Sequence, residues 1–146
     1  MRLDGKVALI SGAARGIGEA IARKCASEGA VVWIGDVLED LGQTTAADIT
    51  ATGGTAHFIR LDVTQEADWA AAVSAAETQH GGLHILVNNA GTGTPGKVED
   101  VPLAEWQRVM DVNATGVFLG TKAAIPALRR AGGGSIVNMS SQLGLV

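Results

Sequence analysis

The sequence predicts a doubly wound α/β domain, in which helices cover both faces of a parallel sheet. Short apolar runs rich in branched side chains, which suit buried strands, alternate with longer segments of helical periodicity. A glycine-rich turn joins the first run to the first helical segment, and an aspartate ends the second run. These three observations favour a single α/β domain over residues 1–146.

The first part of the chain contains three predicted strands and two helices. The apolar run at residues 7–10 predicts the first strand, and apolar residues at 17, 21 and 25 recur after it at helical spacing. The run at 31–34 predicts the second strand, and residues 38–52 predict a surface helix closed by two glycines. Residues 56–61 mix polar and apolar side chains and predict the third strand.

The same alternation continues to the end of the chain. Thr64 and Asp68 indicate the start of a third helix, which ends at a pair of glycines. Residues 84–87 predict the fourth strand, because the run is too short for a helix and turn residues bound it. A long helix is expected over residues 103–130, with Pro126 kinking or ending it. A fifth strand over residues 135–141 then ends in two serines.

Composition and charge narrow the class of protein further. The chain has 146 residues, of which 47% are hydrophobic, and a formal net charge of −4. These values suit one compact domain and give no reason to expect a nucleic acid or a membrane as a partner. The single cysteine cannot form an internal disulfide, and the sequence has no signal peptide and no membrane-length apolar run. A cytoplasmic location is therefore expected.

Three glycines between the first strand and the first helix predict a phosphate site. Gly12 permits a sharp turn, Gly16 leaves no side chain between backbone and ligand, and Gly18 lets the helix press against the sheet. The free N–H groups and dipole of the helix start favour an anion there. An ordinary glycine turn is the alternative. Asp36 favours the phosphate site. It lies 18 residues after Gly18, which is close to the separation at which an acidic residue meets the ribose of a bound dinucleotide.

Small and amide residues end the fourth strand, where its carboxyl end should face the same crevice. In the block Asn88-Asn89-Ala90-Gly91, small residues would let a flat ring lie on the backbone, and the amides would supply directed hydrogen bonds. The next stretch, residues 91–96, matches Gly-x-Gly-x-x-Gly letter for letter. No helical pattern follows it, so we expect a mobile loop without a second phosphate site.

Other residues that could carry chemistry give weaker signals. The histidines at positions 57, 80 and 84 have no metal-ligand spacing with one another or with Cys25, so no metal site is expected. Cys25 falls on the apolar face of the first helix, which favours a buried structural thiol over a nucleophile. Asn113 falls inside the long helix, where Asn is unfavourable, and a solvent-facing Asn remains an equal alternative to a functional one.

These motifs together resemble the N-terminal part of the short-chain dehydrogenase/reductase family. The likeness covers nearly all of the chain, and its motifs appear in family order: the three glycines, Asp62-Val63, Asn88-Asn89-Ala90-Gly91, Asn113 and Ser140-Ser141. The resemblance implies a Rossmann-type sheet with strand order 3-2-1-4-5. It also implies hydride exchange between nicotinamide and a secondary alcohol or ketone.

The resemblance assigns roles residue by residue. Pyrophosphate and the adjoining ribose would be held by Gly12, Arg15, Gly16, Ile17 and Gly18. Asp36 would bind the adenosine ribose, Asp62 and Val63 would flank the adenine, and Asn89, Ala90 and Gly91 would line the cofactor cleft. Asn113 would anchor a water in a proton relay, and Ser141 would hydrogen-bond the reacting oxygen of the substrate. The expected cofactor is NAD, because Asp36 would repel a 2′-phosphate, although Arg15 would attract one.

One departure from the family pattern concerns the proton donor. The family uses a Tyr in a Tyr-x-x-x-Lys motif, and these 146 residues contain no Tyr. We expect the sequence to be part of a longer protein that continues into this motif and into a sixth and a seventh strand. The full-length protein is expected to be a homo-oligomer. The alternative is a non-catalytic dinucleotide-binding module that lacks the Tyr/Lys pair.

Overall fold

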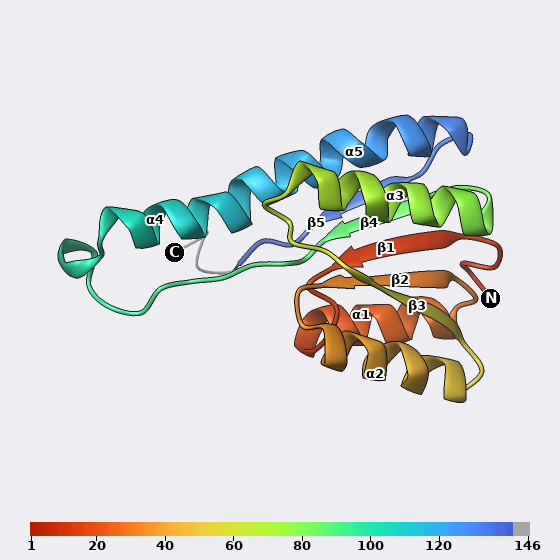
Figure 1. Cartoon of the computed structure of the whole chain (residues 1–146). Coiled ribbons are helices and arrows are strands. Elements are labelled where there is room, and N and C mark those ends of the chain that lie inside the picture. The colour runs from red at the N-terminus through yellow and green to blue at the C-terminus, as the bar shows by residue number, and fades with distance from the viewer. Residues whose placement is uncertain (142–146) are drawn as a thin grey trace.

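The predicted sheet is confirmed in its class and its strand order. The computed structural model describes residues 1–141, so the last five residues of the predicted domain lie outside it. Its five parallel strands lie in the order β3-β2-β1-β4-β5 (Figure 1). They are β1 (Val7–Ser11), β2 (Val31–Asp36), β3 (Thr55–Arg60), β4 (Ile85–Asn88) and β5 (Ser135–Asn138).

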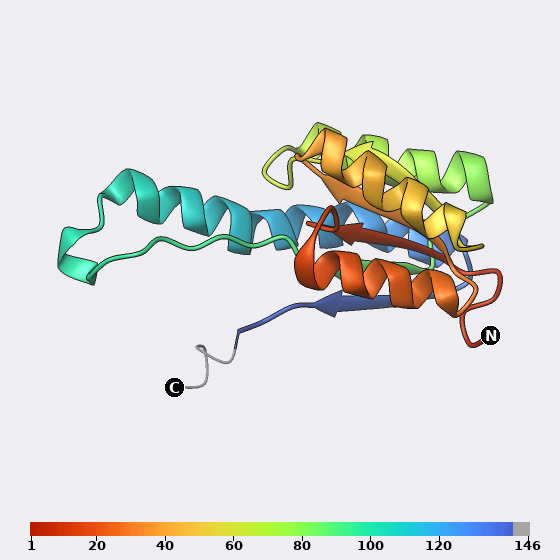
Figure 2. The ribbon, with the colours of Figure 1, turned by 90° about the horizontal axis from the view of Figure 1, so that it is seen from below.

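Helices cover both faces of this sheet (Figures 1 and 2). One face carries α1 (Gly16–Ser27) and α2 (Glu39–Ala51), and the other carries α3 (Glu66–His80) and α5 (Gly116–Arg130). Side chains alternate between the faces along each strand. In β1, Leu9 therefore belongs to the core under α3 and α5, while the next residue belongs to the core under α1 and α2.

Burial decreases from the centre of the sheet to its edges. All five residues of β1 are buried, because β2 and β4 pair with it on both sides. The edge strand β3 is half-buried, and β5 is mostly exposed. The centre of the sheet is therefore the rigid support from which the loops at the carboxyl ends of the strands project.

The buried face of α1 differs from the predicted one. Apolar spacing at 17, 21 and 25 suggested the core face, but Ile17 is 67% exposed. The buried residues are Gly18, Ala22 and Ala26, one position later along the helix. Small residues are needed there because α1 lies close against the sheet. Cys25 is half-buried beside this stripe, and burial raises the pKa of its thiol, as suits a structural residue.

The helix predicted over residues 103–130 is continuous but not uniform. It consists of α4 (Leu103–Met110), a π-helical turn η2 (Asp111–Thr115) and α5. Pro126 lies inside α5 and does not end it, so of the two predicted outcomes the stop is excluded and the kink stays a prediction. The helix ends at Arg130, before two glycines with positive φ. Together with the preceding loop and the 3₁₀ turn η1 (Val98–Asp100), α4 and η2 form an arm, residues 92–115, that extends beyond the strands (Figures 1 and 2).

The fifth strand is shorter than predicted. It ends at Asn138 instead of Ser141 because its partner β4 ends at Asn88. The last ladder bond runs from the Met139 N–H to the Asn88 carbonyl oxygen at 2.9 Å. The two serines therefore follow the strand as irregular backbone.

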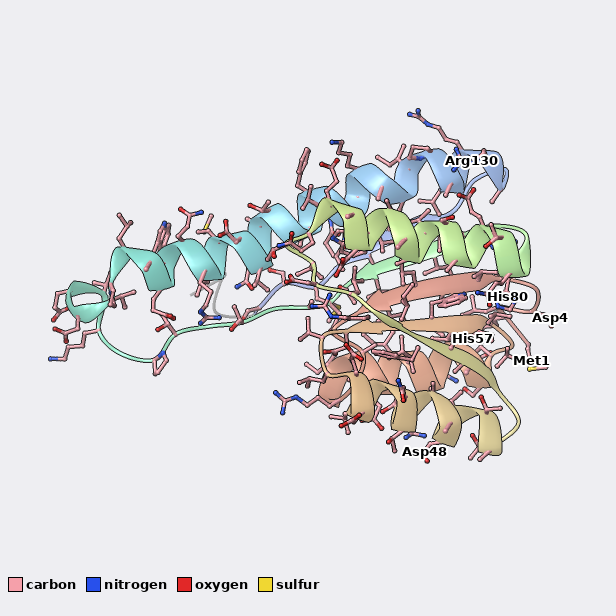
Figure 3. All side chains as sticks on the ribbon, in the orientation of Figure 1. Met1, Asp4, Asp48, His57, His80 and Arg130 are labelled. Carbon is pink, nitrogen blue, oxygen red and sulfur yellow. The ribbon has the colours of Figure 1, made fainter. Side chains whose placement is uncertain are left out.

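Two of the histidines come together, which the sequence did not indicate. His57 of β3 stacks on Trp33 of β2 with ring centroids 4.9 Å apart, and His80 of α3 lies 4.8 Å from His57. Figure 3 shows both histidines at the end of the molecule away from the arm. Among residues 1–141, no three His, Cys, Asp or Glu side chains are grouped as a metal site would need. Nor is any helix in this range long and apolar enough to cross a membrane.

Candidate functional site

A cavity of about 580 Å³ opens where the carboxyl ends of β1, β2 and β4 meet. In doubly wound sheets this edge is where ligands bind. All eleven residues that the resemblance assigned to the cofactor line this one cavity, together with Val37, Leu38, Leu61, Thr92 and Val112. The eleven are Gly12, Arg15, Gly16, Ile17, Gly18, Asp36, Asp62, Val63, Asn89, Ala90 and Gly91.

The three glycines of the first loop have different surroundings. A Cβ at Gly12 would lie 2.7 Å from the Ala90 Cα, and one at Gly18 would overlap the Gly12 carbonyl oxygen. Both positions are therefore closed to larger residues by packing. At Gly16, with φ of 63°, a Cβ would meet no described atom within 4 Å. The loop is thus tight against the protein at two glycines and open toward the cavity at the third.

The start of α1 faces this open side. Arg15 is the N-cap with extended backbone, and no side chain among the described residues caps the helix. The first N–H groups of a helix lack intrahelical partners and carry the positive end of its dipole. This surface fits a pyrophosphate, because the open side of Gly16 leaves room for it next to the helix N-terminus.

Asp36 ends β2 on the wall of the cavity next to the glycine loop. The residue is only 8% exposed, and its Oδ2 accepts a hydrogen bond from the Ala14 N–H at 2.9 Å. Its Oδ1 accepts one from the Leu38 N–H at 3.1 Å. Two backbone donors thus fix the carboxylate, and each oxygen keeps a lone pair for a further donor. A ribose diol, with two adjacent hydroxyls, matches that remaining capacity.

The block after β4 holds the glycine loop in place. Asn89 Nδ2 donates to the carbonyl oxygens of Ser11 and Gly12, both at 3.0 Å. Ser11 Oγ accepts from the N–H groups of Asn89 and Ala90, both at 3.1 Å. The sequence predicts that the amides bond a ligand, but the Asn89 amide nitrogen bonds the loop instead. Ser11 was not anticipated, because nothing in a strand residue indicates which backbone groups it will meet.

Asn88 was expected to share in ligand binding but lies away from the cavity. Its Nδ2 donates to Asn138 Oδ1 at 2.8 Å and to Thr121 Oγ1 at 3.3 Å. It therefore connects β4 to β5 and to α5. This network was not predicted, because it joins residues that are far apart in the sequence.

Asn113 and Ser141 line a second cavity, of about 690 Å³, next to the first. Ile17 and residues 89–92 belong to both cavities, so the two are adjacent. The side chain of Asn113 bonds the backbone of Thr92 twice, accepting from its N–H and donating to its carbonyl oxygen, both at 2.8 Å. Asn113 is therefore exposed, as the solvent-facing alternative implied, but its side chain is also bonded to the loop, and its functional role stays a prediction. Its position within the π-helical turn η2 explains how an Asn fits inside a long helix.

Arg108 of α4 supports the same loop residue. Its guanidinium donates to Thr92 Oγ1 at 3.0 Å and to the Gly93 carbonyl oxygen at 3.1 Å. Residues 91–96 form a loop that leads to the short 3₁₀ turn η1, with no α-helix directly after it. The helix that should follow a phosphate-binding Gly-x-Gly-x-x-Gly turn is therefore missing there, and the absence of a second phosphate site stays a prediction.

Comparisons with known proteins agree with this geometry. A family model described as short chain dehydrogenase matches residues 6–146. A 3-alpha-(or 20-beta)-hydroxysteroid dehydrogenase of Mycobacterium tuberculosis is 52% identical over 99% of this chain and 54% of its own length. A 2,5-dichloro-2,5-cyclohexadiene-1,4-diol dehydrogenase of Sphingobium indicum is 50% identical over 99% of this chain and 58% of its own.

A solved structure extends the likeness to three dimensions. The crystal structure of a short-chain type dehydrogenase/reductase from Mycobacterium marinum superposes with a TM-score of 0.94 at 40% identity, covering 99% of this chain and 59% of that one. The chain thus spans about half the length of the curated relatives it matches.

Proposed function

Because this chain belongs to the short-chain dehydrogenase family, we propose that it binds NAD(H) for hydride exchange with a secondary alcohol or ketone. Dehydrogenases of this family generally use a nicotinamide cofactor. The finer assignment to NAD rests on Asp36, whose fixed and buried carboxylate is the observation that carries the proposal. A carboxylate accepts hydrogen bonds from both ribose hydroxyls but repels a 2′-phosphate.

Two arginines near the adenosine ribose could favour NADP instead, and the geometry argues against both. Arg60 pairs with Asp36 in the sheet register, but its guanidinium bonds Asp68 at 2.9 Å and lies 3.5 Å from Glu39. Its charge is therefore already neutralised by two acids. Arg15 is exposed at the rim, whereas Asp36 is held by two backbone donors inside the cavity wall. We give the carboxylate precedence for this reason.

The remaining residues divide the work of binding. Gly12, Gly16 and Gly18 would bring the start of α1 against the pyrophosphate, and Asp62 and Val63 would flank the adenine. Bound nicotinamide would supply or accept the hydride. The chain itself positions the cofactor through the Asn89 and Ser11 hydrogen bonds that hold the glycine loop.

The proton is the part of the reaction that these residues do not supply. Reduction of a ketone needs a proton on oxygen from a donor of suitable pKa within hydrogen-bond reach. Ser141 would polarise the substrate oxygen, and Asn113 would support a water next to it. Neither titrates in the useful range, and the 146 residues contain no Tyr. We therefore assign to this chain cofactor binding and substrate polarisation, with the acid/base residue to come from a Tyr-x-x-x-Lys segment.

The substrate class proposed for the whole protein is a cyclic secondary alcohol or ketone. The names of the two relatives above refer to a hydroxysteroid and to a cyclohexadienediol, and a 44% identical relative from Comamonas testosteroni is a cyclopentanol dehydrogenase. We also propose that the whole protein is a homo-oligomer and that it is located in the cytoplasm. The second candidate function is a non-catalytic dinucleotide-binding module, which the fixed Asp36 carboxylate on the wall of the cavity would serve equally well.

Titration of NADH and NADPH against the chain, followed by nicotinamide fluorescence, tests the proposal. NADH should bind more tightly than NADPH. Asp36→Ala should reduce this difference in affinity, mainly by weakening the binding of NADH. Asp40→Ala is the matched control, because Asp40 is an exposed acid in the first turn of α2 that does not line the cavity. Tighter binding of NADPH by the wild-type chain would contradict the assignment to NAD.

A further inference from the structure

The segment between β3 and α3 forms one wall of the dinucleotide cavity. Leu61, Asp62 and Val63 line the cavity, yet this segment belongs to no helix or strand. Irregular backbone keeps its place only through bonds to its neighbours. The contacts that fix this wall therefore decide where the adenine side of the cavity lies.

Two consecutive residues of α3 bond two consecutive residues of this wall. Asp68 Oδ2 accepts a hydrogen bond from the Asp62 N–H at 2.9 Å. The indole Nε1 of Trp69 donates to the Val63 carbonyl oxygen at 2.9 Å, and Trp69 is fully buried. The wall is thus attached to α3 at two adjacent backbone groups.

The bond made by Asp68 differs from the ordinary arrangement at a helix start. An acid in the third helical position usually accepts from the N–H of the N-cap residue. Here the N-cap is Gln65, and its N–H donates to the Asp62 carbonyl oxygen at 3.0 Å. Asp68 reaches further back, to the N–H of Asp62. Both backbone groups of Asp62 are therefore bonded.

The side chain of Asp62 is fixed as well, and Asp68 has a second partner. Asp62 Oδ1 accepts from the N–H and the Oγ1 of Thr64, at 3.0 and 2.8 Å. Asp68 Oδ2 also accepts from Arg60 Nη1 at 2.9 Å, and Arg60 lies at the end of β3. Hydrogen bonds to an ionised carboxylate are stronger than neutral ones. Asp68 thus joins the end of the edge strand, the wall and α3.

We infer that Asp68 is a positioning residue for the adenine side of the cofactor cavity. It does not line the cavity, but it fixes the backbone of Asp62 and, with Trp69, that of Val63. The inference rests on the proposed function, since it concerns the same cofactor. Asp68 is the better residue to test, because removal of the fully buried Trp69 would disturb the core.

The test measures binding of adenosine monophosphate and of nicotinamide mononucleotide by calorimetry. Asp68→Ala should weaken adenosine monophosphate about tenfold, because the Asp62 amide loses its ionised acceptor. Asp68→Asn keeps an oxygen acceptor for that amide and should recover most of the affinity. Glu66→Ala is the matched control, since Glu66 is an acid in the same helix turn whose partner is Lys122, away from the cavity. None of these three substitutions should change the affinity for nicotinamide mononucleotide.

The possible outcomes distinguish a failure of this inference from a failure of the proposed function on which it rests. If the wild-type chain binds adenosine monophosphate and Asp68→Ala binds it with the same affinity, the inference about Asp68 is overturned and the proposed function is not. An equal loss in Glu66→Ala would also overturn the inference, because any acid in that turn would then have the same effect. A wild-type chain that binds no adenosine nucleotide would overturn the proposed function together with this inference.

Discussion

The two sides of the cofactor cavity are supported in different ways. On the adenosine side, β1 is fully buried, Asp36 is 8% exposed, and buried Trp69 holds the wall next to the adenine. On the other side, α4 and η2 contain no buried residue, and three of the four residues of β5 are exposed. Asn113 and Arg108, which hold Thr92 there, are themselves exposed.

Under the proposed function, this difference predicts which part of cofactor binding the chain performs by itself. Binding of a rigid ligand group needs a wall whose own rotamers and backbone are fixed by packing. Under the proposed function, the described residues would provide such a wall for adenosine and pyrophosphate. The second cavity, where nicotinamide and substrate would lie, is lined mostly by exposed residues, among them Gly91, Asn113 and Ser141. We therefore expect adenosine binding to persist in this chain and turnover to be absent.

The largest expected effect concerns turnover. The 146-residue chain should show no measurable dehydrogenase activity in an NADH absorbance assay with secondary alcohols and ketones. Loss of a positioned acid alone lowers the rate by about 10²–10⁴. A longer version that carries Tyr-x-x-x-Lys should be active, and Ser141→Ala in that version should remove most of the activity. Robust turnover by the 146-residue chain would mean that the proton donor is misassigned.

A pair of glycine substitutions compares the two sides directly. Gly18→Ala places a methyl group onto the Gly12 carbonyl oxygen and 2.5 Å from Asn89 Nδ2, so it should cost about 1–3 kcal/mol of stability and disrupt adenosine binding. In Gly91→Ala the nearest atom would be Asn113 Oδ1 at 3.6 Å, an ordinary contact. Thermal melts should therefore show a lower Tm only for the first variant. Equal losses in both would contradict the contrast between the sides.

The exposed arm predicts self-association. Leu103, Trp106 and Met110 recur at helical spacing along α4 and are 79%, 56% and 37% exposed. β5 also has no further strand beside it within residues 1–141. Sedimentation should show self-association of the wild-type chain, which Leu103→Glu with Trp106→Glu should reduce. Gln43→Glu with Ala47→Glu, at two exposed positions of α2, adds the same two negative charges elsewhere and should have no effect. A monodisperse monomer at high concentration would contradict this prediction.

The smallest expected effect lies at the end of the molecule away from the cavity. Burial, and to a lesser degree the charge of His80, lowers the pKa of His57 from its ordinary 6.5. The unfolded chain therefore binds a proton more readily than the folded one, and this contribution to stability is lost as pH falls through the unfolded value. His57→Gln should reduce the drop in Tm between about pH 7.5 and 5.5. Adenosine affinity should not change; an unchanged drop in Tm would show that His57 does not contribute.

The parts of the site that could be predicted are those encoded locally. The glycine loop and Asp36 follow from a strand, a turn, a helix and a strand in direct succession, and the structure brings them to one cavity. The side-chain bonds that fix the cavity were not predicted. Ser11 Oγ, at the end of β1, accepts a hydrogen bond from the Asn89 N–H, which follows β4. Asp68 accepts one from the Asp62 N–H, which lies before the N-cap residue of its own helix. A single sequence has no periodicity that indicates such contacts.

The arm was the least predictable part of the fold. Apolar spacing correctly indicated a helix over residues 103–130, but it did not indicate which part of that helix is buried. Burial begins only at Gly116, where the helix passes over the sheet. Periodicity shows that a helix has an apolar face and does not show what covers that face. The side chain of Asn113, in the π-helical turn, bonds the backbone of Thr92, and no pattern in the sequence predicts these bonds either.

Calorimetric titration of the wild-type chain with ADP-ribose and with NAD⁺ tests the central claim most directly. ADP-ribose carries the adenosine and both phosphates but lacks the nicotinamide ring. If the adenosine side is complete and the other side is open, the two ligands should bind with Kd values within about threefold of each other. Binding of NAD⁺ more than about tenfold tighter than ADP-ribose, which corresponds to about 1.4 kcal/mol from the nicotinamide ring, would contradict the account.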